Sequence, residues 1–123
     1  MKYENHFSVF DEVEKDLLKL QKSIAIEILN RIVLLTPVDE GRARGNWLVS
    51  LGYPDSSEQD IYDESGRGTI VHGTGIIKGV KDLGYIYIQN NLPYIEFLND
   101  GGSSQADRFF IETAIHDVVS KIK

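Results

Sequence analysis

The sequence predicts an α+β fold in which two long helices, one toward each end of the chain, pack on a small, mainly antiparallel β-sheet, with a mobile acidic and glycine-rich middle segment. At 123 residues the chain suits a single domain spanning 1–123. Apolar residues recur at helical spacing near both ends, and two short runs between them are rich in β-branched and aromatic residues. Helices and strands that occupy separate stretches of sequence are typical of this fold class.

The first helix is expected over residues 9–35. Apolar residues recur there every three or four positions, namely Phe10, Val13, Leu17, Leu20, Ile24, Ile28, Ile32 and Leu35. Ser8 and Asp11 resemble a capping box, and Thr36-Pro37 ends the helix because the residue before a proline is pushed out of the α region. Extra apolar residues in the second half widen the buried face, so we expect this helix to be the main partner of the sheet.

Two strands are predicted. In residues 46–51, Trp47, Val49 and Leu51 share one face, and Trp47 is expected to anchor the core. Residues 85–88 read Tyr-Ile-Tyr-Ile, with the two tyrosines on one face and the two isoleucines on the other. Both faces of this second strand are bulky, which favours either burial on both sides or a tyrosine face that meets a partner.

Between the strands the periodicity weakens. Residues 38–45 form a turn-rich connection, and residues 52–68 combine acidic side chains with turn formers, which predicts a solvated loop. Residues 69–83 hold three glycines, yet Ile70, Ile77 and Val80 fit one helical face, so a short helix is narrowly favoured over a hairpin.

Beyond the second strand, the asparagines at 90 and 91 favour a turn, and Pro93 suits the start of a short helix over 95–98. Residues 99–102 (NDGG) are expected to break that helix. The last helix is expected over 107–122, with Asp107 as its N-cap. Its apolar residues are Phe110, Ala114, Ile115, Val118 and Ile122.

Composition excludes several functions. The chain has no cysteine, so disulfides, thiol catalysis and cysteine metal ligands are ruled out. No apolar run approaches the roughly 20 residues of a membrane span, and the first residues lack the order of a secretory signal. The net charge of −6, with basic residues scattered, argues against a dedicated nucleic-acid-binding protein.

Candidate reaction centres are weak. His6, His72 and His116 lie in separate segments without the spacing of a zinc motif, and His116 is expected to be solvated. The glycine pattern of residues 66–79 lacks the Gly-Lys-Ser/Thr ending of a phosphate loop. No cofactor and no metal are therefore expected. The alternative that we retain is a small metal-dependent accessory enzyme that uses His72 with nearby carboxylates, which are Asp60, Asp63 and Glu64.

Two separated motifs carry a resemblance to a known family. The first motif is formed by residues 36–39 (TPVD) and 41–47 (GRARGNW), and the second by residues 87–96 (YIQNNLPYIE) and 102–106 (GSSQA). Together with the two terminal helices, they resemble the small neck, tail-completion or minor tail proteins at the head–tail connection of tailed bacteriophages. Family members commonly have Gln-Ala-Pro where this chain has Gln105-Ala106-Asp107. Their middle region carries a helix.

The resemblance implies a structural virion protein rather than an enzyme, made in the bacterial host cytoplasm and located in the tail or neck. Copies would form a ring, of six or twelve subunits, around the DNA channel, which completes the tail or joins it to the head. The implied partners are the connector or adaptor and the tail tube or tail terminator proteins. Genomic DNA would pass through the lumen without sequence-specific binding, and no membrane is involved.

Ring interfaces need aromatic anchors and charged groups that a neighbour can contact. The candidates for a subunit or partner interface are Arg42, Arg44, Tyr85, Tyr87, Tyr94 and Phe97. Arg42 and Arg44 would clamp an acidic partner or, as the alternative, form salt bridges to Asp39 or Glu40. The acidic residues 55–64 would order on assembly or, as the alternative, face the lumen.

Overall fold

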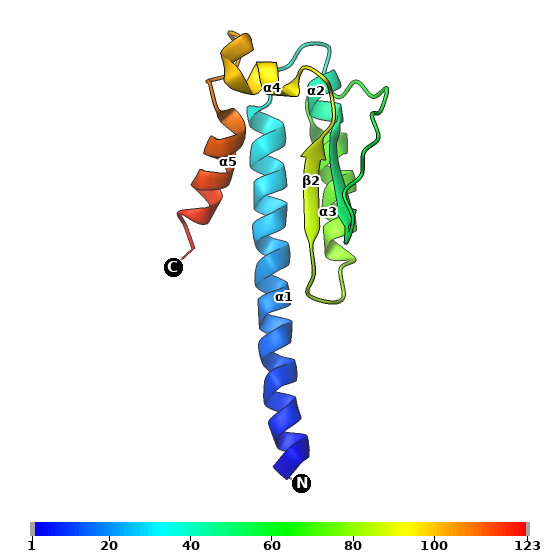
Figure 1. The fold of residues 1–123 in the computed structure, drawn as a ribbon, viewed down its shortest axis with the longest axis vertical. Coiled ribbons are helices and arrows are strands. Elements are labelled where there is room, and N and C mark those ends of the chain that lie inside the picture. Colours follow the sequence, from blue (N-terminus) through cyan, green and yellow to red (C-terminus); the bar gives the residue numbers. More distant parts are fainter. Residues whose placement is uncertain (1, 123) are drawn as a thin grey trace.

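A computed structural model describes residues 2–122, with side chains from Val9 onward within the first helix. Figure 1 shows one helix, α1, along the whole length of the molecule, with the other elements gathered around the half nearer its C-terminal end. The elements are α1 (Lys2–Leu35), α2 (Arg42–Gly45), β1 (Trp47–Leu51), α3 (Arg67–Lys78), β2 (Ile86–Asn90), α4 (Ile95–Phe97), a π-helical turn η1 (Leu98–Gly102) and α5 (Phe110–Val119). The predicted α+β fold is confirmed.

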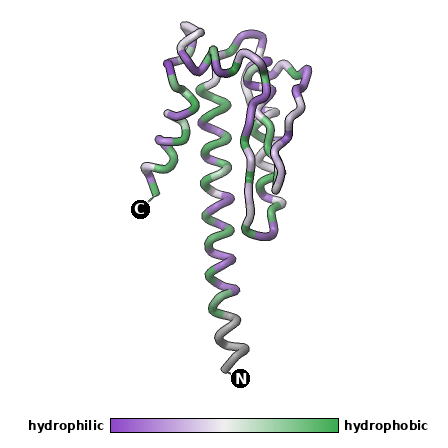
Figure 2. Tube along the Cα trace, in the orientation of Figure 1, coloured by the Kyte–Doolittle hydropathy of each residue, from purple (hydrophilic) through white to green (hydrophobic). Residues whose placement is uncertain are grey.

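The core lies where α1 is covered on two sides. Helix α5 packs along one side, and α3 with the sheet packs along the other (Figure 1). Leu29 and Val33 of α1 are fully buried, as are Ile77 of α3 and Ala114 of α5. Figure 2 shows that α1 is mostly apolar in this covered half and alternates between polar and apolar residues toward its N-terminus.

The sheet is a single antiparallel pair in which Trp47 lies opposite Asn90 and Leu51 opposite Ile86. Trp47 is 6% exposed, which confirms its predicted place in the core. Its indole Nε1 donates a hydrogen bond of 2.8 Å to the hydroxyl of Thr36, which ties β1 to the end of α1. The predicted short helix in the glycine-rich region is also confirmed as α3.

Both helix starts differ from the prediction. Helix α1 begins at Lys2, so Ser8 lies inside the helix and its predicted capping box with Asp11 is not the helix start. Helix α5 begins at Phe110, and the residue before it, Phe109, is left-handed with φ 63°. Asp107 is therefore not the N-cap.

Asn99 takes the role expected of Asp107. Its side-chain oxygen accepts a hydrogen bond from the backbone N–H of Ile111 at 3.0 Å, and its carbonyl accepts one from Phe109 at 2.6 Å. Residues 99–102 were expected to break the short helix, but the chain continues through η1 and leaves helical geometry at Gly101, where φ is 97°. This turn places Asn99 over the first N–H groups of α5, which need an acceptor from outside the helix.

Residues 52–66 contain no helix or strand, in agreement with the predicted loop. The segment is nevertheless anchored along its length. Asn91 donates to the carbonyls of Asp55 and Ser57, and Asn46 exchanges two hydrogen bonds with the backbone of Gln59. These contacts oppose the mobility that the sequence predicts for this segment.

Candidate functional site

The two motifs meet at a pocket at the end of the molecule where α1 finishes. The pocket has a volume of about 500 Å³ and opens between α2, residues 37–40, the segment around Tyr62, and α4 with η1. Its lining residues are Pro37, Asp39, Glu40, Arg42, Ala43, Tyr62, Tyr94, Phe97, Leu98, Gly102, Ser103 and Gln105. Most of them belong to one motif or the other, although the motifs are far apart in the sequence.

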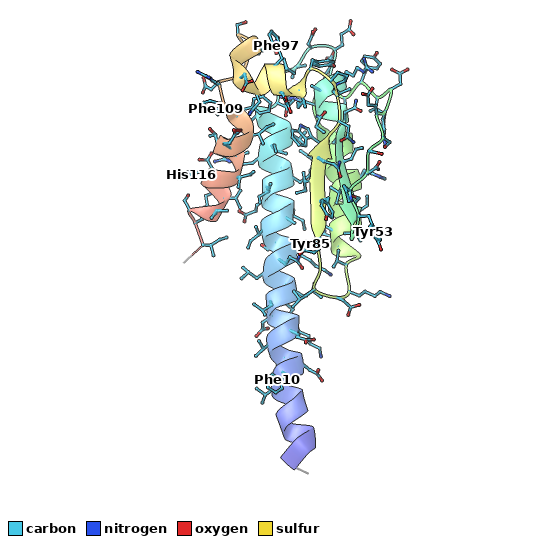
Figure 3. All side chains as sticks on the ribbon, viewed as in Figure 1. Phe10, Tyr53, Tyr85, Phe97, Phe109 and His116 are labelled. Atoms are coloured by element: carbon cyan, nitrogen blue, oxygen red, sulfur yellow. The ribbon has the colours of Figure 1, made fainter. Side chains whose placement is uncertain are left out.

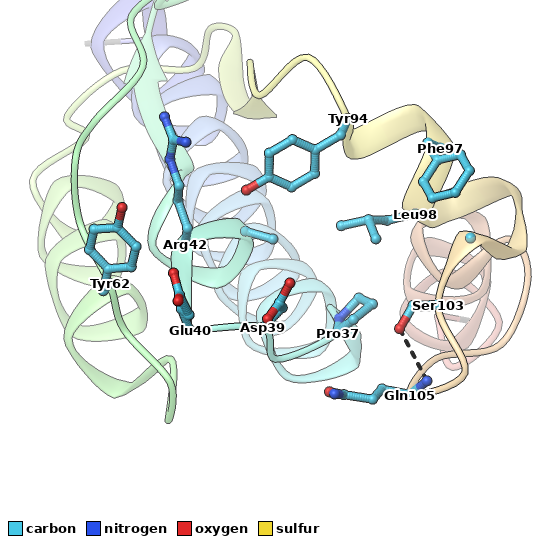
Figure 4. Close-up of a pocket in the computed structure, with 12 residues that line it drawn as sticks. Pro37, Asp39, Glu40, Arg42, Tyr62, Tyr94, Phe97, Leu98, Ser103 and Gln105 are labelled. Carbon is cyan, nitrogen blue, oxygen red and sulfur yellow. Dashed lines mark hydrogen bonds between the residues drawn. The ribbon is translucent and has the colours of Figure 1, made fainter.

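Figure 4 shows how the lining side chains are placed. The ring of Tyr94 extends from the start of α4 toward Arg42 on α2, and Phe97 and Leu98 lie on the far side of the pocket from Tyr62. Asp39 and Glu40 place two carboxylates at the rim between them. The pocket thus combines aromatic surface with charges of both signs, an arrangement that suits a polypeptide segment with polar and apolar side chains.

Three of the predicted interface residues belong to this pocket. Tyr94 is 37% exposed and Phe97 is 64% exposed, so both rings are available for contact. Arg42 reaches Glu58 with a 4.0 Å separation between its Nη2 and a carboxylate oxygen, while its Nε is shielded from solvent and has no acceptor among residues 2–122. Arg42 therefore has donor capacity that the described chain leaves unused.

Burial raises the pKa of the Tyr94 hydroxyl above its ordinary value of 10.0; the positive charge of Arg42 opposes this shift, and the negative charge of Asp39 reinforces it. Tyr94 therefore keeps its proton near neutral pH and can both donate and accept a hydrogen bond at the pocket. Partial exposure of this ring leaves its hydroxyl within reach of a partner.

Arg44 serves the fold rather than the pocket. Its guanidinium donates three hydrogen bonds of 2.9 Å each, to the carbonyls of Thr36, Leu34 and Glu64. The first two carbonyls belong to the end of α1, which has no intrahelical partners for its last carbonyl groups. Arg44 thus closes α1 and fastens the acidic segment to it, in place of the ion pair with Asp39 or Glu40 that the sequence suggested.

The other motif residues also support the pocket. The side-chain oxygen of Gln105 accepts a hydrogen bond from the Val38 N–H at 3.0 Å, which joins the second motif to the first. Asn90 donates to the carbonyl of Ala43 in α2 at 2.8 Å. Gly41 has φ 81°, and a Cβ there would collide with the backbone nitrogen of Glu64. These residues hold the segments that line the pocket in position, so their role in the two motifs is structural.

Tyr85 and Tyr87 lie away from the pocket, on the sheet. Their ring centroids are 6.1 Å apart, and Tyr85 is 76% exposed. Tyr87 lies in β2 and is half-buried. The structure therefore divides the six predicted interface residues into pocket residues, a separate tyrosine pair and the structural residue Arg44.

The residues of the alternative enzyme lie on α3 and in the segment before it. His72 is exposed on α3, and both carboxylate oxygens of Asp63 accept hydrogen bonds around the start of that helix, from Thr69 at 2.8 Å and Gly66 at 3.2 Å. Among the side chains that the structure describes, those of residues 9–122, no three from His, Asp or Glu are close enough to hold a metal ion. Asp63 therefore has a structural role that the sequence did not indicate.

Sequence reasoning missed Tyr62 and Gln105 as pocket residues. Tyr62 lies in the acidic segment, where nothing in the local pattern indicates that the chain returns to α2. The hydrogen bond from the Asp63 N–H to the Gly41 carbonyl, at 2.9 Å, produces that return. In the sequence, the glycine at position 41 was a signal that another segment packs there, because glycine often allows close approach of a second backbone segment.

Comparison with protein-family models, with curated proteins and with solved structures finds no match for this chain. Within residues 2–122, no helix has both the length and the apolarity needed to cross a membrane.

Proposed function

We propose that this protein is a non-enzymatic virion subunit of the head–tail connection of a tailed bacteriophage. Copies assemble as a ring of six or twelve around the DNA channel and complete the tail or join it to the head. One observation carries the proposal: residues of both motifs that resemble the neck and tail-completion family line one pocket. A resemblance spread over two distant segments gains weight when both segments build the same surface.

The composition of the pocket supports a protein partner. Tyr94 and Phe97 provide exposed aromatic surface, and the Arg42 side chain beside them is 37% exposed. Tyrosine and arginine are enriched among the residues that dominate protein–protein binding energy. Under this proposal, the pocket receives a segment of an adjacent virion protein, such as the connector or the tail terminator.

The charge of the chain supports passage of DNA without adhesion. The net charge is −6, and Glu58, Asp60 and Glu64 of the anchored segment are exposed. Phosphate groups are repelled by such a surface unless basic residues neutralise them. A ring that presents this segment to its lumen would let the genome slide.

The test begins with native mass spectrometry of the purified protein over a concentration series, with and without the connector and tail terminator proteins of the same genome. We expect a discrete closed species, or a stable complex with one of these proteins. The double substitution Tyr94→Ala with Phe97→Ala should weaken binding to the partner by about tenfold or more, because two aromatic anchors are lost.

The matched control is Tyr53→Ala, which removes an aromatic ring that is 83% exposed and lies outside the pocket. Its binding should equal that of the wild-type protein. A strict monomer that binds none of the head–tail proteins would contradict the proposal. If the pocket and control variants lost the same amount of binding affinity, the partner would not bind at this pocket.

A further inference from the structure

The half of α1 nearer the N-terminus carries an exposed apolar stripe. Its members are Val9, Phe10, Val13, Leu17 and Leu20, which are between 48% and 59% exposed. From Phe10 onward the spacing is three, four and three residues, so these side chains share one helix face. The sequence predicted these positions as part of the continuous amphipathic face of α1; the structure covers that face only in its second half.

Helix α5 is the element that covers the same face farther along. Arg31 of α1 pairs with Asp117 of α5 at 3.3 Å, and Leu35 lies beside Phe110. Figure 3 shows Phe10 projecting from the side of α1 on which α5 packs. Because α5 ends at Val119, the stripe is left exposed where α5 stops. A further helix could continue the packing that α5 begins.

The edges of the stripe are acidic. Glu12 and Asp16 lie one turn apart along one edge, and Glu14 lies on the other. Direct pairing of two stripes from two copies would bring carboxylates together on both edges, which is unfavourable. The charge of the stripe therefore calls for a basic counterpart.

The outer face of α3 provides such a counterpart. Arg67, Val71, Gly75 and Lys78 recur at spacings of four, four and three residues and are all exposed; Val71 is 64% exposed. Helix α3 contains no acidic residue. A Cβ added at Gly75 would meet nothing within 4 Å, so a neighbouring helix can approach closely at this point.

We infer that the stripe of one copy docks on the outer face of α3 of the next copy. This inference rests on the proposed function, since it names the surfaces through which the ring closes. The contact is heterologous, as a ring requires, because each copy offers its stripe to one neighbour and its α3 face to the other. Since α3 packs beside the half of α1 nearer its C-terminal end (Figure 1), the stripe and the α3 face are separate surfaces of one copy.

The size of the contact sets its strength. The stripe consists of five side chains that are each about half exposed, so it offers less area than the roughly 600 Å² per partner at the lower limit for stable interfaces. Association is therefore concentration-dependent for the isolated protein and strengthened by the partner proteins in the virion. Salt weakens it, because charges of opposite sign flank the contact.

Cysteine cross-linking tests the contact directly, because the chain has no cysteine of its own. A chain with both Leu17→Cys and Val71→Cys should form a ladder of disulfide-linked copies under mild oxidation. An equimolar mixture of the two single variants should form only linked dimers, and each dimer should contain one copy of each variant. A matched chain with Lys19→Cys and Val71→Cys, whose first cysteine lies on the opposite face of α1, should remain largely unlinked.

Charge reversal supplies a second measurement. Glu12→Lys with Asp16→Lys should weaken association by at least tenfold, and so should Arg67→Glu with Lys78→Glu. All four changes in one chain should restore it. Dimers of Leu17→Cys alone, which would show stripe-to-stripe pairing, would overturn the inference. Absence of linked species from the Leu17→Cys, Val71→Cys chain at about 1 mM protein would also overturn it. A closed ring seen by native mass spectrometry without this linkage would leave the proposed function standing.

Discussion

The first half of α1 and the segment 52–66 show that regular structure and anchoring are separate properties. Residues 9–20 are helical, but the side chains of the apolar stripe within them are about half exposed. The segment 52–66 has no helix or strand, but other parts of the fold hold it at several points. A helix satisfies its own backbone hydrogen bonds, whereas an irregular segment must obtain partners elsewhere. Here the irregular segment is the better fixed of the two.

The partners of the irregular segment are mostly asparagine and glutamine side chains in the strands and beside them. Asn46 is 1% exposed and bonds both backbone groups of Gln59, and Gln89 accepts from the Asp55 N–H at 2.7 Å. Amide side chains can donate and accept at once, so each one substitutes for a strand neighbour. The backbone of the segment is thus hydrogen-bonded to its neighbours, as a strand would be, although it has no strand geometry.

Substitution at Gly41 should have the largest effect on this comparison. Gly41 and Gly52 both have positive φ, of 81° and 78°, but a Cβ at Gly41 would collide with the backbone of Glu64, while a Cβ at Gly52 would meet nothing within 4 Å. We expect Gly41→Ala to lower the free energy of unfolding by about 4 kcal/mol and Gly52→Ala to lower it by about 1 kcal/mol. Urea unfolding measures both.

The difference between the two glycines isolates the packing of the segment, because the backbone strain is shared. Hydrogen exchange should show faster exchange at the Asp63 amide in Gly41→Ala, since its bond to the Gly41 carbonyl is lost. Equal destabilisation by the two alanines would mean that the segment contributes little to the stability of the fold.

An intermediate effect is expected at Asp63. Burial raises the pKa of this carboxyl, whereas hydrogen bonds from Thr69, Gly66 and Ser65 lower it. The hydrogen bonds have the larger combined effect, so the pKa lies below the ordinary value of 3.8. The folded state thus favours the carboxylate, so its stabilisation is complete above about pH 4 and is lost as the pH falls through the lowered pKa. Asp63→Asn should cost about 1 kcal/mol near neutral pH, because an NH₂ group replaces one of the two oxygens that accept hydrogen bonds from Gly66 and Thr69.

This loss should shrink as the pH falls through the lowered pKa of the wild-type carboxyl, because that carboxyl then takes up a proton in the folded state. Urea unfolding near neutral pH and at about pH 3 gives the comparison. The control is Asp107→Asn, an exposed carboxylate that caps no helix, and its stability should match the wild-type protein at both pH values. A loss for Asp63→Asn that is equally large in acid would assign the effect to packing rather than to charge.

The smallest effect on stability is expected in the stripe. Leu17→Ser should change the free energy of unfolding of the monomer by less than about 0.5 kcal/mol, because the side chain is already 48% exposed. Leu29→Ala, at a fully buried position of the same helix, should cost about 3 kcal/mol. Thermal unfolding at low protein concentration measures both, and a large loss for Leu17→Ser would show that the first half of α1 is packed within the monomer.

The longer helices and the two strands could be predicted because each has a local cause, whereas the short helix α2 (Arg42–Gly45) lies in a stretch that was predicted as a turn-rich connection. The period of α1, the proline after Thr36 and the alternating bulky residues of β2 act within a few positions of sequence. Three interface candidates, Arg42, Tyr94 and Phe97, were also placed together by the structure. Their aromatic or charged side chains indicated residues that contact a partner. That they share one pocket could not be predicted, because it depends on how two distant segments pack together.

What the sequence could not predict depends on distant partners. Asn99 replaces Asp107 at the start of α5 because η1 carries it there, and Arg44 binds three carbonyls that no local pattern brings together. The exposure of Leu17 and Leu20 follows from the length of α5, which ends before it reaches them. Periodicity identifies an apolar face; it does not say which part of that face is covered.

The way in which residues 52–66 are anchored also separates what must be kept from what can change. The bonds from Asn46 and Asn91 reach the backbone carbonyls of Asp55, Ser57 and Gln59, which any residue supplies, and only the N–H of Gln59 excludes proline. Side chains such as those of Ser56 and Asp60 are exposed. Positions such as 56 and 60 can therefore change their outward chemistry while the path of the segment stays constant, whereas the side chain of Asp63 is needed at the start of α3.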